Sequence, residues 1–301
     1  MEKQYFYEND YYYSYYTKGE VEYKFFFFEE DKNIKSQLEF VKKHSINEIN
    51  LVDISEKNVN KIINFIIENE IFLYSLHLQQ LTLNDIDFLQ HFQTIENLTI
   101  VVEVNKRFNF NVLKKLRKLE LFMGKYFLFE DISKNISILK LHKVNSKCSM
   151  GFSELKPVKD LDIFQSTLTE INGLKDLKNV ESLNLRYVPK LNNIEPIKEY
   201  KKLKHLRIKN CKNITDWEII GKIGSLKTIT IDSCGKIESL DFLENIDLME
   251  FYLVDTQVED GNVSWLLNKK ITRIDFPVYK HYNITPEELW EYQRKIGQRK
   301  L

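Results

Sequence analysis

Residues 158–187 read VKDLDIFQSTLTEINGLKDLKNVESLNLRY and contain one apolar pattern twice. The pattern apolar-x-x-apolar-x-apolar occupies Val158, Leu161 and Ile163, and it begins again 22 residues later at Val180. Successive side chains of a β-strand point to opposite faces, so the alternating centre of the pattern predicts a short strand with one buried face. Each copy therefore contributes one strand, and stacked copies build a parallel sheet.

The same pattern continues over most of the 301 residues. Eleven copies follow one another at steps of about 22 residues, and their central apolar residues are Ile49, Leu76, Leu98, Leu119, Leu139, Leu161, Leu183, Leu206, Ile229, Phe251 and Ile274. Behind four copies, apolar residues recur at every third position, beginning at Leu168, Leu191, Ile214 and Ile237. Side chains three apart share a face only in a three-residue turn, so the return segments are predicted to be 3₁₀ turns or very short helices.

This frame, closed by a short polar or thiol residue, resembles the leucine-rich repeat, specifically the 22-residue class of bacterial internalins and protein-phosphatase regulatory subunits. The resemblance covers residues 46–281. It implies an α/β solenoid of about eleven repeats, with a parallel concave sheet and a 3₁₀ or short-helical convex side. In this family the closing side chains bond to loop backbone and stack from repeat to repeat. The resemblance assigns that role to Cys211 and Cys234, with Ser166 and Thr256 as smaller substitutes.

Residues 1–45 lie outside the repeat, and a solenoid needs such segments because its terminal repeats would otherwise expose their core. Thirteen of the first 28 residues are Tyr or Phe. They predict an aromatic β-hairpin over residues 11–28, with a four-residue loop containing Gly19. Its structural role is a cap over the first repeat; its functional alternatives are an aromatic contact platform or a strand edge that a partner extends. Asp31 and Ser55 are the expected N-caps of two following helices.

The last segment, residues 282–301, is predicted to form a short C-terminal capping helix. Thr285 and Glu288 fit a capping box, with Pro286 at the first helical position. Because both caps continue the repeat directly, we expect one continuous structural domain: residues 1–45 as N-terminal cap, 46–281 as solenoid and 282–301 as C-terminal cap.

Composition disfavours several classes of function. Lys+Arg and Asp+Glu are balanced at 44 each, and only seven of the basic residues are Arg, which argues against a dedicated nucleic-acid binder. No apolar run approaches the ~18 residues of a membrane span.

The N-terminus has no secretory signal pattern, so a cytoplasmic location is expected. Cys148, Cys211 and Cys234 have no CxxC spacing and predict neither a disulfide framework nor a zinc site.

No catalytic constellation is recognisable in the sequence. Only His77, His142 and His205 fall on predicted strands. They lie whole repeats apart, too far from one another to bind the same metal ion. No HExxH, Walker or GxSxG motif occurs. We therefore expect a non-enzymatic protein without a metal, a cofactor or a small-molecule substrate.

The predicted function rests on the concave sheet face, where the polar positions of each strand point to solvent. An apolar patch is expected from Val101, Val102, Phe122, Met123, Phe164 and Tyr187. A basic band is expected from Lys140, His142, Lys143, Arg186, Arg207 and Lys209. An acidic end is expected from Asp232, Glu250, Asp255 and Asp275. Such clusters are typical of protein-binding surfaces. The predicted partner-binding set is Val101, Phe122, Met123, Lys140, His142, Phe164, Arg186, Tyr187, Arg207, Lys209 and Tyr252.

These features predict a module that binds a folded protein on its concave face. By analogy of architecture, a small stand-alone solenoid resembles a bacterial immunity protein that neutralises a toxin. The alternatives are an exported internalin-like virulence effector, a scaffold or regulatory subunit of a cellular enzyme, and nucleic-acid contact through the basic band. In purely structural interpretations, the N-terminal arm or neighbouring side chains cover Phe122 and Phe164, and the basic band is an ordinary solvated face.

Overall fold

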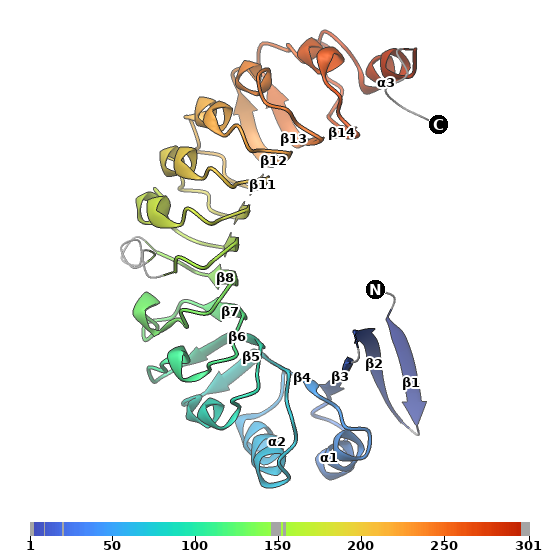
Figure 1. The fold of residues 1–301 in the computed structure, drawn as a ribbon, viewed down its shortest axis with the longest axis vertical. Helices are drawn as coiled ribbons and strands as arrows, with labels where there is room; N and C mark the ends of the chain where they lie inside the picture. The colour runs from blue at the N-terminus through green and yellow to red at the C-terminus, as the bar shows by residue number, and fades with distance from the viewer. Residues whose placement is uncertain (1–2, 9, 20, 146–151, 153–154, 296–301) are drawn as a thin grey trace. The chain divides into compact units, whose positions relative to one another are not determined.

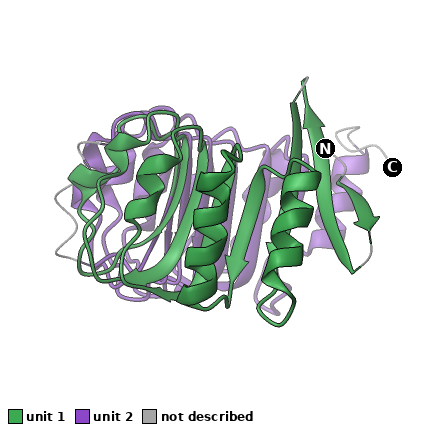
Figure 2. Ribbon diagram, turned by 90° about the horizontal axis from the view of Figure 1, so that it is seen from below, with its two compact units in different colours: residues 1–139 green, residues 140–301 purple. Residues whose placement is uncertain are grey.

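The structure is a computed structural model that describes residues 3–8, 10–19, 21–145, 152 and 155–295. The chain forms two compact units, residues 1–139 and 140–301 (Figure 2). Strand β8 (Ile138–His142) carries the chain from unit 1 into unit 2. Cys148 lies outside the described residues.

Unit 1 begins with three antiparallel strands, where the sequence predicted a two-stranded hairpin. β1 (Gln4–Glu8) pairs with β2 (Tyr11–Lys18), which in turn pairs with β3 (Val21–Phe28) (Figure 1). One face of this small sheet packs on the following helix, and its buried Tyr13 and Phe26 meet Phe40 of that helix at ring-centroid distances of 6.2 and 5.5 Å. The arm therefore has an aromatic core of its own.

The first helix, α1 (Ile34–Lys43), begins two residues later than predicted. Asn33 is its N-cap and accepts a hydrogen bond from Ser36 N–H, so the expected cap at Asp31 is wrong. The reason is the buried Gln37 side chain, which accepts from Glu29 N–H and donates to Glu29 O, both at 2.8 Å. These two bonds hold the preceding loop in a non-helical conformation.

The repeats of unit 1 are parallel strands joined by helical segments on one side of the sheet. β3 pairs in parallel with the first repeat strand, and the pairing continues strand by strand to β7. The second helix begins at Glu56 after its predicted cap Ser55 and accounts for the longer first step. The elements after α1 are β4 (Glu48–Val52), α2 (Glu56–Glu68), β5 (Ser75–Leu83), η1 (Asp87–His91), β6 (Asn97–Val104), η2 (Phe110–Val112), β7 (Lys118–Phe122) and η3 (Phe129–Asp131).

Unit 2 repeats the same plan, and the four return segments predicted to be 3₁₀ turns or very short helices, after β9, β10, β11 and β12, are 3₁₀ helices in the described part of the chain. Its strands pair in parallel from β9 to β14, and the central residues Leu161, Leu183 and Leu206 lie side by side in register. The elements are β9 (Asp160–Phe164), η6 (Asn172–Asp176), β10 (Ser182–Arg186), η7 (Glu195–Glu199), β11 (His205–Lys209), η8 (Trp217–Lys222), β12 (Thr228–Ile237), η9 (Asp241–Leu243), β13 (Glu250–Val258), η10 (Ser264–Asn268), β14 (Arg273–Asp275) and α3 (Pro286–Lys295).

The C-terminal helix α3 starts with the predicted capping box. Thr285 N–H donates to Glu288 Oε2 at 2.8 Å, and Glu288 N–H donates to Thr285 Oγ1 at 3.2 Å. Two backbone donors that the first helical turn leaves without partners are thereby satisfied. Leu289 of the helix is buried against the last repeat.

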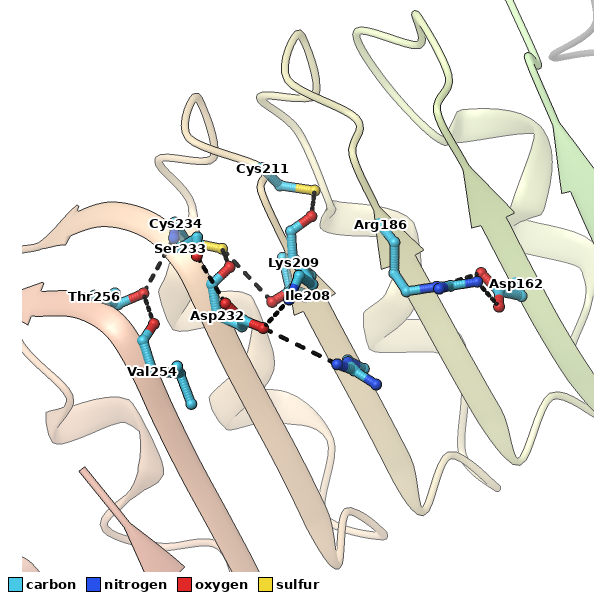
Figure 3. Close-up of polar contacts among 11 residues, drawn as sticks. Asp162, Arg186, Ile208, Lys209, Cys211, Asp232, Ser233, Cys234, Val254 and Thr256 are labelled. Carbon is cyan, nitrogen blue, oxygen red and sulfur yellow. Dashed lines mark hydrogen bonds and ion pairs between the residues drawn. The ribbon is translucent and has the colours of Figure 1, made fainter. Parts of the chain in front are cut away.

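The residues that close the repeats of unit 2 are buried and bonded to loop backbone, as the resemblance implied. The Cys211 thiol donates to Lys209 O at 3.4 Å, and the Cys234 thiol donates to Asp232 O at 3.3 Å (Figure 3). Thr256 Oγ1 accepts from Cys234 N–H at 3.1 Å, and Ser166 Oγ accepts from Val144 N–H at 3.0 Å. The Thr256 and Ser166 contacts link neighbouring repeats, and so do longer contacts of 3.6 Å from the Cys211 thiol to Leu185 O and from the Cys234 thiol to Ile208 O.

This environment predicts two unreactive cysteines. Burial raises the pKa of Cys211 to about 12 and that of Cys234 to about 11, and the thiolate is the form that alkylates. In the native protein at pH 8, iodoacetamide should modify both cysteines at least about a hundredfold more slowly than in 8 M urea, since each pKa unit costs tenfold in thiolate. Peptide mass spectrometry measures each site separately, and rapid native labelling of either would contradict the buried position.

Candidate functional site

The candidate site lies on the open face of the sheet, the face that the helical return segments leave uncovered. In unit 2 the pairing register aligns two rows of side chains across this face. The first row is Asp162, Asn184, Arg207, Thr230 and Tyr252; the second is Phe164, Arg186, Lys209, Asp232 and Val254. Both rows stand on short strands whose alternate residues are fully buried, which fixes the backbone that carries them.

An aromatic cluster forms at the β9–β10 end of these rows. Phe164 makes edge-to-face contacts with His142 and Tyr187, at ring-centroid distances of 5.1 and 5.4 Å. The guanidinium of Arg186 lies 4.8 Å from the Phe164 ring centroid, a cation–π distance. Phe164 is only half-buried and Tyr187 is 41% exposed. The side chains that contact the Phe164 ring are its neighbours His142, Arg186 and Tyr187, so the cover by neighbouring side chains that the structural interpretation allowed is partial.

Acidic side chains hold the basic residues beside the cluster. Asp162 accepts two hydrogen bonds from Arg186, at 3.0 and 2.6 Å, and Asp232 accepts one from Lys209 at 2.6 Å (Figure 3). Burial by itself would raise the pKa of Asp232, but the hydrogen bonds from Lys209 and Ser233 outweigh it and lower this pKa. Both carboxylates hold and orient their basic partners through these bonds.

The predicted separation of a basic band from an acidic end is therefore wrong at its centre. Asp162, on β9, lies inside the band and pairs with Arg186. Asp232, expected in the acidic end, borders the band on β12 and pairs with Lys209, while Arg207 stands 4.0 Å from the same carboxylate. Arg207 keeps a 47% exposed side chain and is the most accessible cation of these pairs. The face is a mosaic of paired charges beside the Phe164 and Tyr187 rings.

The remaining predicted residues of unit 2 lie at the edges of this arrangement. Lys140 and His142 are half-buried on β8. Tyr252 is half-buried on β13, and Thr230 lies between it and Arg207 in the register. The structure therefore places Tyr252 in the same row as Arg207 but two strands beyond it, and not in the row of Phe164.

In unit 1 the structure corrects the apolar patch. Val101 and Phe122 are half-buried on the open face, and Phe122 borders a depression of about 270 Å³. Val102 and Met123 are each only 3% exposed, so the expectation that they face solvent is wrong.

The backbone explains this correction. In eight repeats the residue two places after the last consensus apolar position has a positive φ, between 43° and 58°, and turns the chain out of the strand; Val102 and Met123 do not. Most of the eight residues are Asp, Asn, Gln or Ser, which reach the left-handed region more easily than a β-branched residue such as Val. At Val102 the strand β6 continues to Val104 instead, and the Val102 side chain is buried. Val278 occupies the same position after Phe276 in the last repeat and is 62% exposed, so the residue type at this position does not by itself predict burial.

Two groups on the open face of unit 1 lie outside the predicted partner-binding set. His77 contacts Ser75 Oγ through Nε2 at 2.8 Å and Thr99 Oγ1 through Nδ1 at 2.9 Å, which links the neighbouring strands β5 and β6. The other group is the exposed aromatic side of β1–β3, which corresponds to the aromatic contact platform considered as an alternative from the sequence. Tyr5 and Tyr7, on the strand that was not predicted, are 56% and 69% exposed.

The described residues contain no group of three or more His, Cys, Asp or Glu side chains placed to hold a metal ion. Among the described helices, none has both the length and the apolar character that crossing a membrane requires.

Taken with its repeat, this architecture defines a leucine-rich-repeat solenoid with 3₁₀ return segments. Comparison with solved structures agrees: an internalin (inlF) of Listeria monocytogenes aligns over 85% of this chain and 82% of its own, with a TM-score of 0.50 and 13% identity. Two further internalins of that organism were also found. Internalin C2 aligns over 62% of this chain and 69% of its own (TM-score 0.36, 13% identity). The functional domain of InlJ aligns over 76% and 53% (TM-score 0.45, 16% identity). At sequence identities this low, the similarity to internalins is one of fold.

No protein-family model matches the sequence, and no curated protein is detectably similar to it.

Proposed function

We propose that this protein is a non-enzymatic binding module that holds a folded protein partner on the open face of unit 2. The contact centre is the aromatic cluster of Phe164 and Tyr187, and Arg207 adds an accessible charge beside it. The observation that carries the proposal is the 41% exposure of Tyr187 on a strand end anchored by buried neighbours. Exposed Tyr and Arg side chains on a rigid support are the residues that most often dominate binding energy.

The charge pairs support a protein partner over nucleic acid. Arg186 and Lys209 are already matched by Asp162 and Asp232, so the face lacks the continuous positive potential that phosphate backbones require. A partner with its own mixed charges around an apolar centre fits this mosaic.

Within this class, our specific proposal is the immunity-protein function that was predicted from the sequence: the open face of unit 2 covers a toxin domain made by the same or a neighbouring cell. Its rivals, an exported effector and a regulatory subunit, use the same face with different partners. If the bound protein is a toxin domain in the producing cell, it supports the immunity function. A host surface protein would support the exported effector, and a housekeeping enzyme would support the regulatory subunit.

Site-specific photocross-linking tests the face itself. We expect p-benzoylphenylalanine in place of Tyr187 to give a discrete cross-linked protein in the native cell. The same group in place of Lys175, exposed on the return segment η6, serves as control and should not. The cross-linked band is identified by mass spectrometry. Equal cross-linking from both positions, or from Lys175 alone, would place the contact elsewhere.

A further inference from the structure

The aromatic arm of unit 1 presents a second surface that the proposed function does not use. In β1–β3, Tyr7 stands opposite Tyr12, and Tyr5 stands opposite Ser14, which in turn stands opposite Phe25. Opposed residues of an antiparallel pair share one face. We call this face the aromatic platform; it consists of Tyr5, Tyr7, Tyr12, Val21, Phe25 and Phe27.

The aromatic platform continues without a break onto the open face of the first repeat. β3 pairs in parallel with β4, which places Phe25 beside Glu48 and Phe27 beside Asn50. Glu48 is a carboxylate that is only 7% exposed. Its Oε1 accepts a hydrogen bond from the Tyr16 hydroxyl at 3.1 Å. A buried carboxylate next to aromatic faces is a favourable place for a cation, since both attract positive charge.

The chain itself already brings a cation to this place. The ammonium of Lys3 lies 5.7 Å from the ring centroid of Phe25. Ser14 separates Tyr5 from Phe25 in the register and is only 8% exposed. Burial raises the pKa of Glu48, and the Tyr16 hydrogen bond and the charges of Lys3 and Lys118 act against that rise. Lys3 is exposed, so another cation can take its position.

We propose that the aromatic platform binds a protein partner through a lysine side chain, whose ammonium replaces Lys3 between Phe25 and Glu48. The surrounding Tyr5, Tyr7 and Phe27 rings pack against the aliphatic stem of that lysine and the residues next to it. This surface belongs to unit 1 and is independent of the Tyr187 cluster, so the partner of one face need not be the partner of the other.

The test uses the full chain and a small probe, N-acetyl-lysine N-methylamide, with the uncharged N-acetyl-norleucine N-methylamide as matched comparison. NMR of ring-labelled Phe and Tyr should show saturable shifts at Phe25 and Tyr16 with the lysine probe and none with norleucine. Replacing Lys3 by Met should tighten probe binding about threefold, the size of an exposed cation–π contact. Glu48→Gln should weaken it about tenfold, as for loss of a charge-assisted hydrogen bond.

Two matched variants control for general charge effects. Lys35→Met and Glu39→Gln remove the same charges at exposed positions of α1 and should leave probe affinity unchanged. Glu48→Gln keeps a hydrogen-bond acceptor for the Tyr16 hydroxyl. If the melting temperature of this variant falls, the test uses Phe25→Leu instead, because that substitution removes the aromatic ring from the site. Equal response to both probes, no gain with Lys3→Met, or no loss with the site variants would overturn the proposal. None of these outcomes bears on the open face of unit 2, because the probe requires no protein partner.

Discussion

Leu206→Ala should lower the free energy of unfolding by about 2–5 kcal/mol, the range for deleting a buried leucine side chain from a packed core. Leu206 is 2% exposed on β11 and lies in register between Leu183 and Ile229. Both neighbours belong to strands held on two sides, so the backbone cannot collapse into the cavity that the substitution leaves. Urea unfolding monitored by circular dichroism measures the change.

His205→Ala is the matched control, because His205 precedes Leu206 on the same strand and is exposed on the other face. It should change stability by no more than about 0.5 kcal/mol, as most surface substitutions do. A large effect at His205 with none at Leu206 would mean that the two faces of the strand have been exchanged, and with them every open-face residue named above.

The strands and their buried residues could be predicted from the sequence because the repeat determines them many times over. A strand side chain points either into the core or to solvent. Because the repeats stack at a 22-residue step, equivalent positions of every copy point to the same side of the sheet. The central residues from Ile49 to Phe251 are accordingly buried, at no more than 2% exposure. The 3₁₀ return segments followed from the same repetition.

Features outside the repeat were harder to predict, since each depends on contacts between residues distant from one another in the sequence. The start of α1 moved from Asp31 to Asn33 because the Gln37 side chain binds the backbone of Glu29. β1 exists because Phe6 stacks on Tyr13 and contacts His44, at 5.2 and 5.0 Å between ring centroids. No local pattern reports such pairings.

Charge arrangement on the open face was predicted only in part. Reading columns of residues along the repeats identified the accessible positions, including Arg207 and Tyr187. It did not show that Asp232 would pair with Lys209 one strand away. Pairing depends on which residues share a row across strands, and rows become visible only when neighbouring repeats are aligned in register.

The combination of Tyr187→Ala with Arg207→Glu should weaken partner binding by about 3 kcal/mol, or more than a hundredfold in Kd. Tyr187 supplies exposed ring surface against Phe164, and truncation removes it from the centre of the proposed contact. Reversing the charge of Arg207 adds a second anion within reach of Asp232 and repels acidic groups of the partner. Isothermal titration calorimetry with the cross-linked partner, once purified, measures the change.

The control is Tyr292→Ala with Arg294→Glu on α3, two exposed residues of the same types in the same unit. This pair should leave Kd within about twofold of the parent, and neither double variant should shift Tm by more than about 2 °C, because surface substitutions away from the core cost little. Full affinity in the Tyr187 and Arg207 variant, together with lost affinity in the α3 variant, would move the contact to the C-terminal cap. Lost affinity in both would indicate a contact that extends from β10 to α3, since these substitutions leave the buried leucines of every repeat in place.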